Sequence, residues 1–583
     1  MINKKKLWSY IKSKGQEHCG ISDLRNDSNE LIQDPLGKAN LLNNQFSSVF
    51  SNPAPTIEHN PPRNGLLPEM NDIKVTRAGV LKLLLNIKEN KATGPDGIPG
   101  QILKICANEL AGVYRLLFQA SLNQGVVPDD WRHANIVPLF KKGDKTNPIN
   151  YRPVSLTSIS CKLLEHIIHS NIMDHLDKHN FLNNAQHGFR QKRSCETQLI
   201  TTLNDFSNCI NERGQIDAVL LDFSKAFDKV DHSGLMLKLK NAGLSASLLN
   251  WCYSFLFNRT QRVVVEGAVS ACMPVQSGVP QGTVLGPLFF LIYINDISLN
   301  LTPGTEIRLF ADDSLLYRRI NTHNDTVILQ KDLDQLQTWE EKWKMEFHPQ
   351  KCQLLRVTNK KKIIKENYKI HDVTLEETDA AKYLGITIDN QLRWKHHYSN
   401  TLKKANGILA FLRRNIHSCP STVKENCYKV LVRPILDYGC CVWDPHFQKD
   451  IQNFEKVQKR AARFVTGNYN FESGGTRTNM DLLGWKPLQE RRAAMKLNLF
   501  YKARNNIIDV PVTNLNLNAR QSRRSETYTI PNSNLDSHLY SFYPSTIRLW
   551  NTLPEHVKHS KSLDAFKTGI DSITLRATYG KVE

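Results

Sequence analysis

The strongest constraint on this chain is a pair of short apolar segments that end or turn at acidic residues. Residues 218–222, Ala-Val-Leu-Leu-Asp, are typical of a buried strand with Asp222 at its end. Residues 307–317 predict a hairpin with Asp312 and Asp313 at its tip. Each feature alone is weak, because an acidic residue at a strand end is usually a cap or a turn former. Together they favour a sheet edge at which three carboxylates converge.

Carboxylates that converge from neighbouring strand ends have the chemistry that binds Mg²⁺, because this ion prefers oxygen ligands. Two such ions, about 3.5 to 4 Å apart, would activate a hydroxyl and stabilise a leaving pyrophosphate. We therefore predict two Mg²⁺ ions, with Mn²⁺ as a substitute, at Asp222, Asp312 and Asp313. The reaction class that this site indicates is nucleotidyl transfer.

The surrounding sequence predicts an α+β fold with a largely antiparallel sheet. Residues 136–140 and 261–266 are further short strand patterns, with helical patterns between them. Five apolar residues step by 3 or 4 positions along one helix face: Leu329, Leu333, Leu336, Trp339 and Trp343. After residue 389 the pattern is almost wholly helical.

The Gly- and Pro-rich segment 276–287 comes directly before an apolar run, residues 288–294. A turn that opens a buried helix directs backbone N–H groups at an anion, and Gly282 would let a ligand approach closely. The alternative is an ordinary turn before a core helix.

The charge of the chain indicates a polyanionic partner. The net charge is +20, and residues 391–583 hold 30 Lys and Arg against 15 Asp and Glu. In this last third, residues 454–464 predict an amphipathic helix with a basic face. The competing interpretation is a solvated basic surface with no ligand.

The cysteines and the terminus indicate a protein inside the cell, with the nucleus and the cytoplasm as the expected locations. The twelve cysteines include no Cys-x-x-Cys pair, which favours a reducing compartment. Met1–Lys12 is basic without an apolar core, and no apolar run approaches about 20 residues. We expect no export signal and no membrane span.

The motifs, taken in order, resemble the reverse transcriptase of a non-LTR (LINE-type, jockey-like) retrotransposon. The boxes that carry the resemblance are Gly94-Pro-Asp-Gly-Ile-Pro99, Lys141-Lys-Gly-Asp144, Asn150-Tyr-Arg-Pro-Val-Ser-Leu156, Gln186-His-Gly-Phe-Arg-Gln-Lys-Arg-Ser194, Leu221-Asp-Phe-Ser-Lys-Ala-Phe-Asp228, Ser277-Gly-Val-Pro-Gln-Gly282, Phe310-Ala-Asp-Asp313, His348-Pro-Gln-Lys-Cys352 and Tyr383-Leu-Gly-Ile386. Their shared order and spacing are far more specific than any single box.

The resemblance implies a right-hand polymerase followed by a basic helical region. Residues 1–75 are expected to be an N-terminal lead-in and linker. Residues 76–389 would form the fingers and palm, with the fingers mainly at 76–215. Residues 390–583 would form the thumb and the basic C-terminal region.

The resemblance also assigns residues to the metals and the nucleotide. Asp222, Asp312 and Asp313 would bind the metals, with the backbone carbonyl of Phe223 as a further ligand. The implied nucleotide-binding residues are Lys141, Lys142, Arg152, Phe223, Phe227, Gln281 and Gly282. Among these, the cations would neutralise the triphosphate, because the fork of Arg152 suits phosphate. Phe227 would lie beneath the sugar and exclude ribonucleotides.

Two further assignments concern proton transfer and nucleic-acid binding. Lys351 matches the position that would protonate the leaving pyrophosphate, although His348 stands where Asn is common and a solvated surface lysine is an equal alternative. The residues expected to bind nucleic acid are Arg190, Lys456, Lys459, Arg460 and Arg463.

The implied activity is Mg²⁺-dependent extension of a DNA 3′ end on an RNA template. The expected partners are an RNA template, a DNA primer or target DNA, dNTPs and a separately encoded endonuclease, because residues 1–75 leave no room for the nuclease that such elements usually encode. The chain is therefore expected to be N-terminally incomplete or to begin downstream of the nuclease. The main alternative is an inactive or domesticated nucleic-acid-binding remnant. An RNA-dependent RNA polymerase or an intron maturase shares the chemistry but fits the motifs less well.

Overall fold

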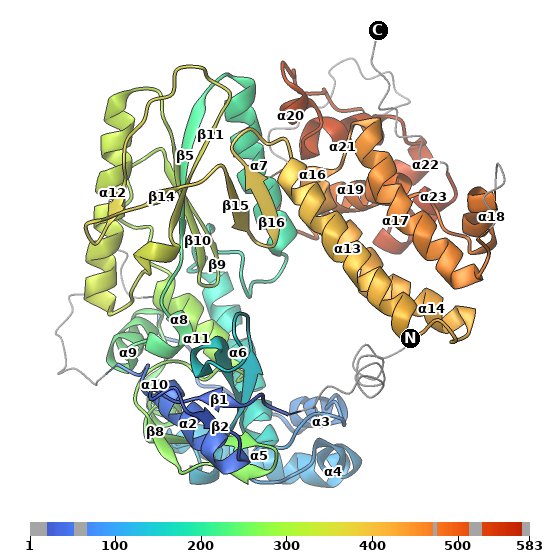
Figure 1. The fold of residues 1–583 in the computed structure, drawn as a ribbon. Coiled ribbons are helices and arrows are strands. Elements are labelled where there is room, and N and C mark those ends of the chain that lie inside the picture. Colours follow the sequence, from blue (N-terminus) through green and yellow to red (C-terminus); the bar gives the residue numbers. More distant parts are fainter. Residues whose placement is uncertain (1–19, 52–66, 470–474, 512–526, 574–583) are drawn as a thin grey trace.

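The computed structural model describes residues 20–51, 67–469, 475–511 and 527–573 (Figure 1). Its central sheet has five strands in the order β14–β11–β5–β10–β9. The strands are β5 (Gln215–Leu221), β9 (Thr305–Phe310), β10 (Asp313–Arg319), β11 (Gln353–Thr358) and β14 (Glu376–Glu377). All neighbours are antiparallel except β11 and β14. The expectation of a mixed helix-and-sheet fold is confirmed.

Helices lie on both sides of this sheet, and β5 at its centre is almost wholly buried (Figure 1). α7 (Cys195–Asn211) packs against β5, β9 and β11, and α12 (His323–Trp343) packs against β10. The five apolar residues that predicted the α12 face are all buried. The β12 (Lys369–Ile370) and β13 (Val373–Thr374) hairpin lies beside α12.

An apolar helix forms the core of the region below the sheet. α11 (Leu285–Ile294) has only one residue that is not buried, Pro287, because it is surrounded by other helices. Those neighbours include α6 (Ile159–Lys178) and α9 (His232–Asn241), with α8 (Ala226–Lys229) and α10 (Ala246–Leu256) close by in the chain. The run 288–294 is therefore a core helix.

A second sheet has the order β4–β3–β6–β7, and β8 also pairs with β6. The strands are β3 (His133–Phe140), β4 (Tyr151–Leu156), β6 (Arg259–Val265), β7 (Ala268–Val269) and β8 (Met273–Val275). β3 and β4 are antiparallel, whereas β3 and β6 are parallel. The helices α3 (Arg77–Leu85), α4 (Gly100–Ile105) and α5 (Ala107–Gln124) pack against one another.

The N-terminal segment does more than lead into the fold. α2 (Pro35–Ser47) follows the small hairpin of β1 (Leu24–Arg25) and β2 (Leu31–Ile32) and packs against β6, β7 and β8. Leu42 and Phe46 of α2 share a core with Val263 of β6. Residues 1–75 were expected to form only a lead-in and a linker, whereas residues 24–47 cover the second sheet. Most of the expected linker, residues 52–66, lies outside the described residues.

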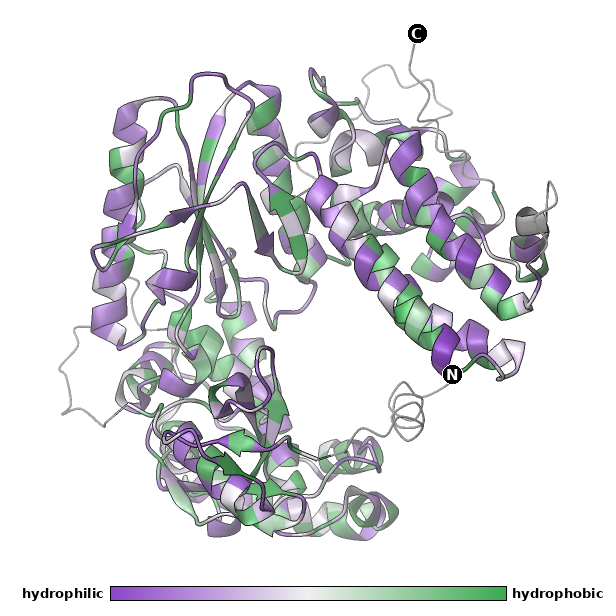
Figure 2. Ribbon diagram, in the orientation of Figure 1, coloured by the Kyte–Doolittle hydropathy of each residue, from purple (hydrophilic) through white to green (hydrophobic). Residues whose placement is uncertain are grey.

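The C-terminal region is helical after the hairpin of β15 (Ala380–Tyr383) and β16 (Ile386–Asp389). Its helices are α13 (Lys395–Asn415), α14 (Ser421–Cys427), a π-helix over Tyr428–Val432, α15 (Arg433–Asp437), α16 (Cys440–Trp443), α17 (Gln448–Thr466), α18 (Gly475–Leu482), α19 (Leu488–Arg504), α20 (Asp536–Leu539), α21 (Phe542–Asn551), α22 (Glu555–Lys558) and α23 (Leu563–Asp571). Figure 2 shows polar and apolar residues alternating along α13 and α17, as amphipathic helices require.

The hydrophobic core does not divide at residue 390. One cluster of buried residues runs from α7 and the central sheet through α13, α17, α19 and α23. α16, α20 and α21 contact α7 directly. Within the described ranges, no helix has the length and apolar character needed to cross a membrane.

Candidate active site

Two strand ends bring three carboxylates to one edge of the central sheet. β5 ends at Leu221, directly before Asp222, and Leu221 pairs with Ser314 of β10. Asp313 is the first residue of β10 and follows the turn at Asp312. Asp222 therefore lies beside the turn that carries the other two carboxylates.

The three carboxylates interact electrostatically. Loss of hydration, together with the negative charges of Asp312 and Asp222, raises the pKa of Asp313 to about 6. Burial also raises the pKa of Asp312, and the nearby Arg152 opposes that rise. A positive charge placed among these groups would relieve their repulsion.

The donor chemistry of this cluster suits Mg²⁺, since all three side chains offer oxygen ligands. Across the described ranges, however, no three His, Cys, Asp or Glu side chains are grouped as a formed metal site. Asp222 instead has a cationic neighbour, with Lys351 Nζ 3.6 Å from Asp222 Oδ2. The residues fit the ion by the chemistry of their donor atoms.

The loop before β11 runs beside Asp222. The His348 N–H donates to the Asp222 carbonyl over 2.8 Å, and Phe347 forms an antiparallel bridge with Phe223. Lys351 follows in the same loop, and the side chain is exposed. The His-Pro-Gln-Lys box therefore lies beside the carboxylates.

Phe223 contributes its side chain to the core. Its ring stacks on Phe347 at 4.3 Å between centroids and lies near Trp339. The buried ring leaves the backbone carbonyl as the group available for the predicted ligand role.

The predicted triphosphate cations come from the second sheet. Arg152 of β4 pairs with Leu139 of β3, and Lys141 follows β3 directly. Partial burial and the positive charge of Arg152 lower the pKa of Lys141, and Asp222 opposes that shift. Arg152 and Lys141 are therefore close to the carboxylates, while Lys142 is an exposed neighbour.

A carboxylate outside the predicted set fixes Gln281. Its Nε2 donates to Asp228 Oδ1 over 2.9 Å, and its backbone carbonyl accepts from the Ser155 N–H over 2.8 Å. Asp228 closes the 221–228 box, but its role was missed because nothing in the sequence pairs it with residue 281.

Gly282 follows in a backbone conformation that favours glycine, with φ of +110°. A Cβ at this position would lie 2.7 Å from the Ser155 carbonyl oxygen. The close approach that requires glycine here is thus to β4, the strand that carries Arg152.

Phe227 is half-buried at the edge of the core. Its ring stacks on Phe290 of α11 at 4.4 Å between centroids and meets Phe189 edge-on. Its backbone carbonyl accepts from the Val279 N–H. The predicted gate residue is therefore supported by the core without being enclosed in it.

Gln186 was quoted in a motif without a role, and the structure gives it a precise contact. Its Oε1 accepts from the Ala311 N–H over 2.9 Å, and its Nε2 donates to the Ala311 carbonyl over 3.3 Å. Ala311 precedes the two aspartates and has a φ of +56°. A glutamine at the start of a segment with one glycine and three cations was the available signal in the sequence.

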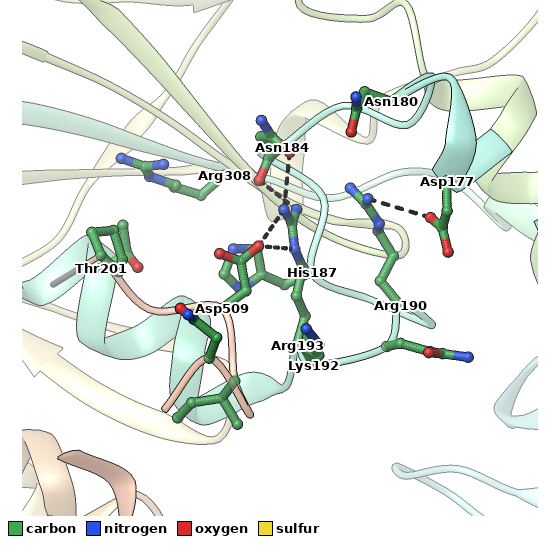
Figure 3. Close-up of a pocket in the computed structure, with 14 residues that line it drawn as sticks. Asp177, Asn180, Asn184, His187, Arg190, Lys192, Arg193, Thr201, Arg308 and Asp509 are labelled. Atoms are coloured by element: carbon green, nitrogen blue, oxygen red, sulfur yellow. Dashed lines mark hydrogen bonds and ion pairs between the residues drawn. The ribbon is translucent and has the colours of Figure 1, made fainter. Parts of the chain in front are cut away.

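Arg190 is held by the protein itself. Its Nη1 donates to the carbonyls of Leu182 and Asn183, and its Nη2 lies 4.0 Å from Asp177. It lines a polar pocket between the 177–193 segment and residues 506–511 (Figure 3). These contacts fix its guanidinium before any nucleic acid binds.

The predicted basic helix is α17. Phe454, Val457, Ala461 and Phe464 are buried along one face, as expected. Of the predicted cations, Lys456, Lys459 and Arg460 are exposed and Arg463 is half-buried. Arg460 Nη1 also donates to Asn406 Oδ1 of α13, which joins the two helices.

The central part of the chain matches a known protein family. Residues 140–388 match the family described as "Reverse transcriptase (RNA-dependent DNA polymerase)". This range contains all three carboxylates and both strand ends that carry them. The strand ends and the carboxylates therefore lie in the part of the chain that is similar to reverse transcriptases.

Proteins similar to this chain include polymerases of mobile elements from Drosophila melanogaster. The chain is 27% identical to "RNA-directed DNA polymerase from mobile element jockey" over 67% of this chain and 44% of that protein. It is 27% identical to "Probable RNA-directed DNA polymerase from transposon X-element" over 67% and 43%, and 27% identical to the corresponding protein of transposon BS over 79% and 53%. The predicted resemblance is confirmed, and the chain spans about half the length of these relatives.

A solved structure is a more distant match to the chain. The apo telomerase from Candida tropicalis, truncated from its C-terminal domain, covers 50% of this chain and 59% of the telomerase chain. The identity is 12% and the TM-score is 0.32, a likeness too weak to support an argument.

Proposed function

We propose that this protein is an RNA-directed DNA polymerase of a non-LTR retrotransposon, which extends a DNA 3′ end on an RNA template. The observation that carries the proposal is the convergence of Asp222 with the Asp312–Asp313 turn inside a reverse transcriptase domain. The substrates are an RNA template, a DNA primer or target DNA, and dNTPs.

The three carboxylates and the Phe223 carbonyl would hold two divalent ions. When bound, these ions lower the pKa of the attacking hydroxyl and stabilise the charge of the leaving pyrophosphate. Asp222, Asp312 and Asp313 supply the negative charge that retains them. Mn²⁺ would substitute for Mg²⁺ because both prefer oxygen ligands.

The cations around the carboxylates would bind the triphosphate. Arg152 and Lys141 lie across from the aspartates on the second sheet, and Lys142 extends this positive edge. The lowered pKa of Lys141 reflects burial and crowding by Arg152, and an incoming triphosphate would relieve the repulsion between these cations.

Lys351 would act on the leaving group. In this structure it faces Asp222 at 3.6 Å, so it is already within the electrostatic reach of the site. Lys351 would hold a proton beside the leaving pyrophosphate and donate it there.

The remaining nucleotide contacts would select and align the substrate. Gln281, fixed by Asp228, and Gly282 would border the nucleotide and template. Phe227 would lie beneath the sugar and exclude a 2′-OH. Its stacking on Phe290 supports a rigid wall, which steric exclusion requires.

The architecture that we propose is a right hand. The central sheet with the carboxylates is the palm, residues 76–215 form most of the fingers, and the helices after 390 form the thumb and a basic nucleic-acid-binding region. Lys456, Lys459 and Arg460 are exposed on α17, which supports a backbone-tracking role for this helix. Arg463 and Arg190 would add contacts to the nucleic-acid backbone.

A separately encoded endonuclease would supply the 3′ end of the primer. The proposed locations of the protein are the nucleus, which holds the target DNA, and the cytoplasm, where RNA is translated. The second candidate, an inactive binding remnant, is not favoured by the residues present, since the three aspartates, Gln281, Gly282 and Arg152 are intact.

The test is primer extension with pure protein on poly(rA)/oligo(dT) with dTTP and Mg²⁺. We expect elongation that EDTA stops and that Mn²⁺ also supports. Binding of the primer-template without elongation in either metal would overturn the proposed activity and favour the remnant.

A further inference from the structure

The segment after α19 returns to the palm and contacts it with a carboxylate. The Asp509 N–H donates to the Lys192 carbonyl over 2.9 Å. Its carboxylate accepts from Arg193 Nε over 2.8 Å, and Arg193 Nη2 lies 2.5 Å from the same oxygen. The next residue, Val510, is buried in the core shared with α7. The C-terminal region is thus fixed to the 186–194 motif.

Arg193 connects this carboxylate to the chain that follows α6. Its Nη1 donates to the carbonyl of Asn184 over 2.8 Å, and its Nη2 donates to Asn184 Oδ1 (Figure 3). The same Nη1 donates to the carbonyl of Gln186 over 2.9 Å. The Arg193 side chain is only 8% exposed. Its donors are therefore committed to Asp509 on one side and to the 184–186 backbone on the other.

The 184–188 segment then holds the turn that carries the aspartates. Besides the two Gln186–Ala311 hydrogen bonds, the His187 N–H donates to the Leu309 carbonyl and the Leu309 N–H donates to the Ala185 carbonyl. The Gly188 N–H donates to Gln186 Oε1, and a Cβ on Gly188 would lie 2.4 Å from the Ala311 nitrogen. The segment thus lies in close contact with the backbone leading into Asp312.

We infer that Asp509, Arg193 and Gln186 are positioning residues that set the Asp312–Asp313 turn, which makes the C-terminal region a support of the catalytic centre. A non-glycine residue with positive φ, such as Ala311, stays in that conformation only where its surroundings fix it. Gln186 supplies that restraint, and Arg193 aligns Gln186 through its carbonyl. The expected effect of these residues on the rate of catalysis rests on the proposed function.

The competing explanation is a surface ion pair of little consequence, because Asp509 is 52% exposed. The two explanations differ in what loss of the carboxylate does at the turn. Loss of a surface pair would change nothing at Ala311. Loss of a positioning contact would loosen the backbone there and slow the chemical step.

The kinetic test compares Asp509→Ala with Asp571→Asn in the full chain. Asp571 forms an ion pair with Lys486 in the same region, and both of these side chains are exposed. We expect Asp509→Ala to lower kcat about tenfold with the KM for dTTP within about twofold, because misplaced groups slow a reaction without weakening substrate binding. We expect Asp571→Asn to match the wild type. An unchanged kcat, or equal changes in kcat and melting temperature for both variants, would overturn the inference.

Hydrogen exchange tests the same inference without activity. The Ala311 amide donates to Gln186 Oε1, so its exchange in a peptide covering 309–313 reports on the turn. We expect faster exchange in Asp509→Ala and unchanged exchange in Asp571→Asn. Equal protection in both variants would overturn the positioning role. This measurement needs no catalysis. An inactive wild type would therefore contradict the proposed function, while the exchange rates would still decide whether Asp509 positions the turn.

A double-mutant cycle tests whether the effect passes through Gln186. Gln186→Met keeps the shape of the side chain and removes its hydrogen bonds. If the contacts act in series, Asp509→Ala adds less than about twofold to the kcat loss of Gln186→Met. Fully additive losses would show that the two residues act independently, and would overturn the proposed connection. If Gln186→Met fails to fold, the exchange measurement remains decisive.

Discussion

At the scale of single residues, the account depends most on Asp312. We predict that Asp312→Asn abolishes primer extension and leaves primer-template affinity within about twofold, because the amide keeps the shape and loses the charge that retains a divalent ion. Extension rates and filter binding measure the two effects. Asp334→Asn, an exposed site on α12, is the control. Undiminished extension would remove the metal role from Asp312, and joint loss of binding and extension would make the residue structural.

Phe227 makes a prediction about sugar selection. We expect Phe227→Val to raise the use of rNTPs relative to dNTPs, because the smaller side chain leaves room for a 2′-OH. Rates with both nucleotide classes on one primer-template give the ratio.

The control for this prediction is Phe290→Val, because Phe290 is fully buried beneath Phe227. It should lower stability and both rates together, as loss of core volume does. An unchanged rNTP to dNTP ratio in Phe227→Val would mean that this residue is only part of the core.

At the scale of elements, the sequence predicts what is local and misses what depends on distant partners. The strand that leads into Asp222, the α12 face and the apolar face of α17 follow from residue periodicity, and the structure has all three. The packing of α2 on β6 joins segments more than 200 residues apart, and no local pattern encodes that contact. The same reason hid the Gln186–Ala311 hydrogen bonds.

The contact between β4 and the turn after β8 gives a prediction at this scale. We expect Gly282→Ala to reduce the free energy of unfolding by about 1–3 kcal/mol, because the methyl group meets the Ser155 carbonyl and the backbone has a positive φ. Thermal or urea unfolding gives the value. Gly267→Ala has a similar φ of +89° and no atom within 4 Å of an added Cβ, so it isolates the backbone effect. Equal losses in the two variants would show that the β4 contact contributes nothing.

At the scale of the whole molecule, the boundary expected at residue 390 is not visible in the packing. The core runs from α7 into α13, α17 and α19, and Arg193 and Asp509 join the same two regions. The basic region can be recognised in the sequence because the net charge rises after residue 390. The hydrophobic core that joins it to the central sheet depends on contacts between distant residues, which only the folded chain shows. For this reason, binding experiments on the basic region belong in the full-length chain.

The basic face of α17 predicts a salt dependence. Each phosphate neutralised in a duplex contributes about −0.9 to the slope of log K against log salt. We therefore expect the triple change of Lys456, Lys459 and Arg460 to Gln to reduce that slope by up to about 2.7. Changing Lys361, Lys362 and Lys365 to Gln removes the same charge from another exposed segment and should leave the slope nearly unchanged. Equal slopes for the two triple variants would make the α17 charge an ordinary solvated surface.

The most direct test of the central claim is run-off synthesis by the purified 583-residue chain on an RNA of defined sequence, with an annealed DNA primer, four dNTPs and Mg²⁺, followed by sequencing of the product. We expect DNA complementary to the template up to its 5′ end, and no such product from Asp312→Asn. A wild-type reaction that yields no complementary DNA, or one that Asp312→Asn performs equally well, would contradict the central claim.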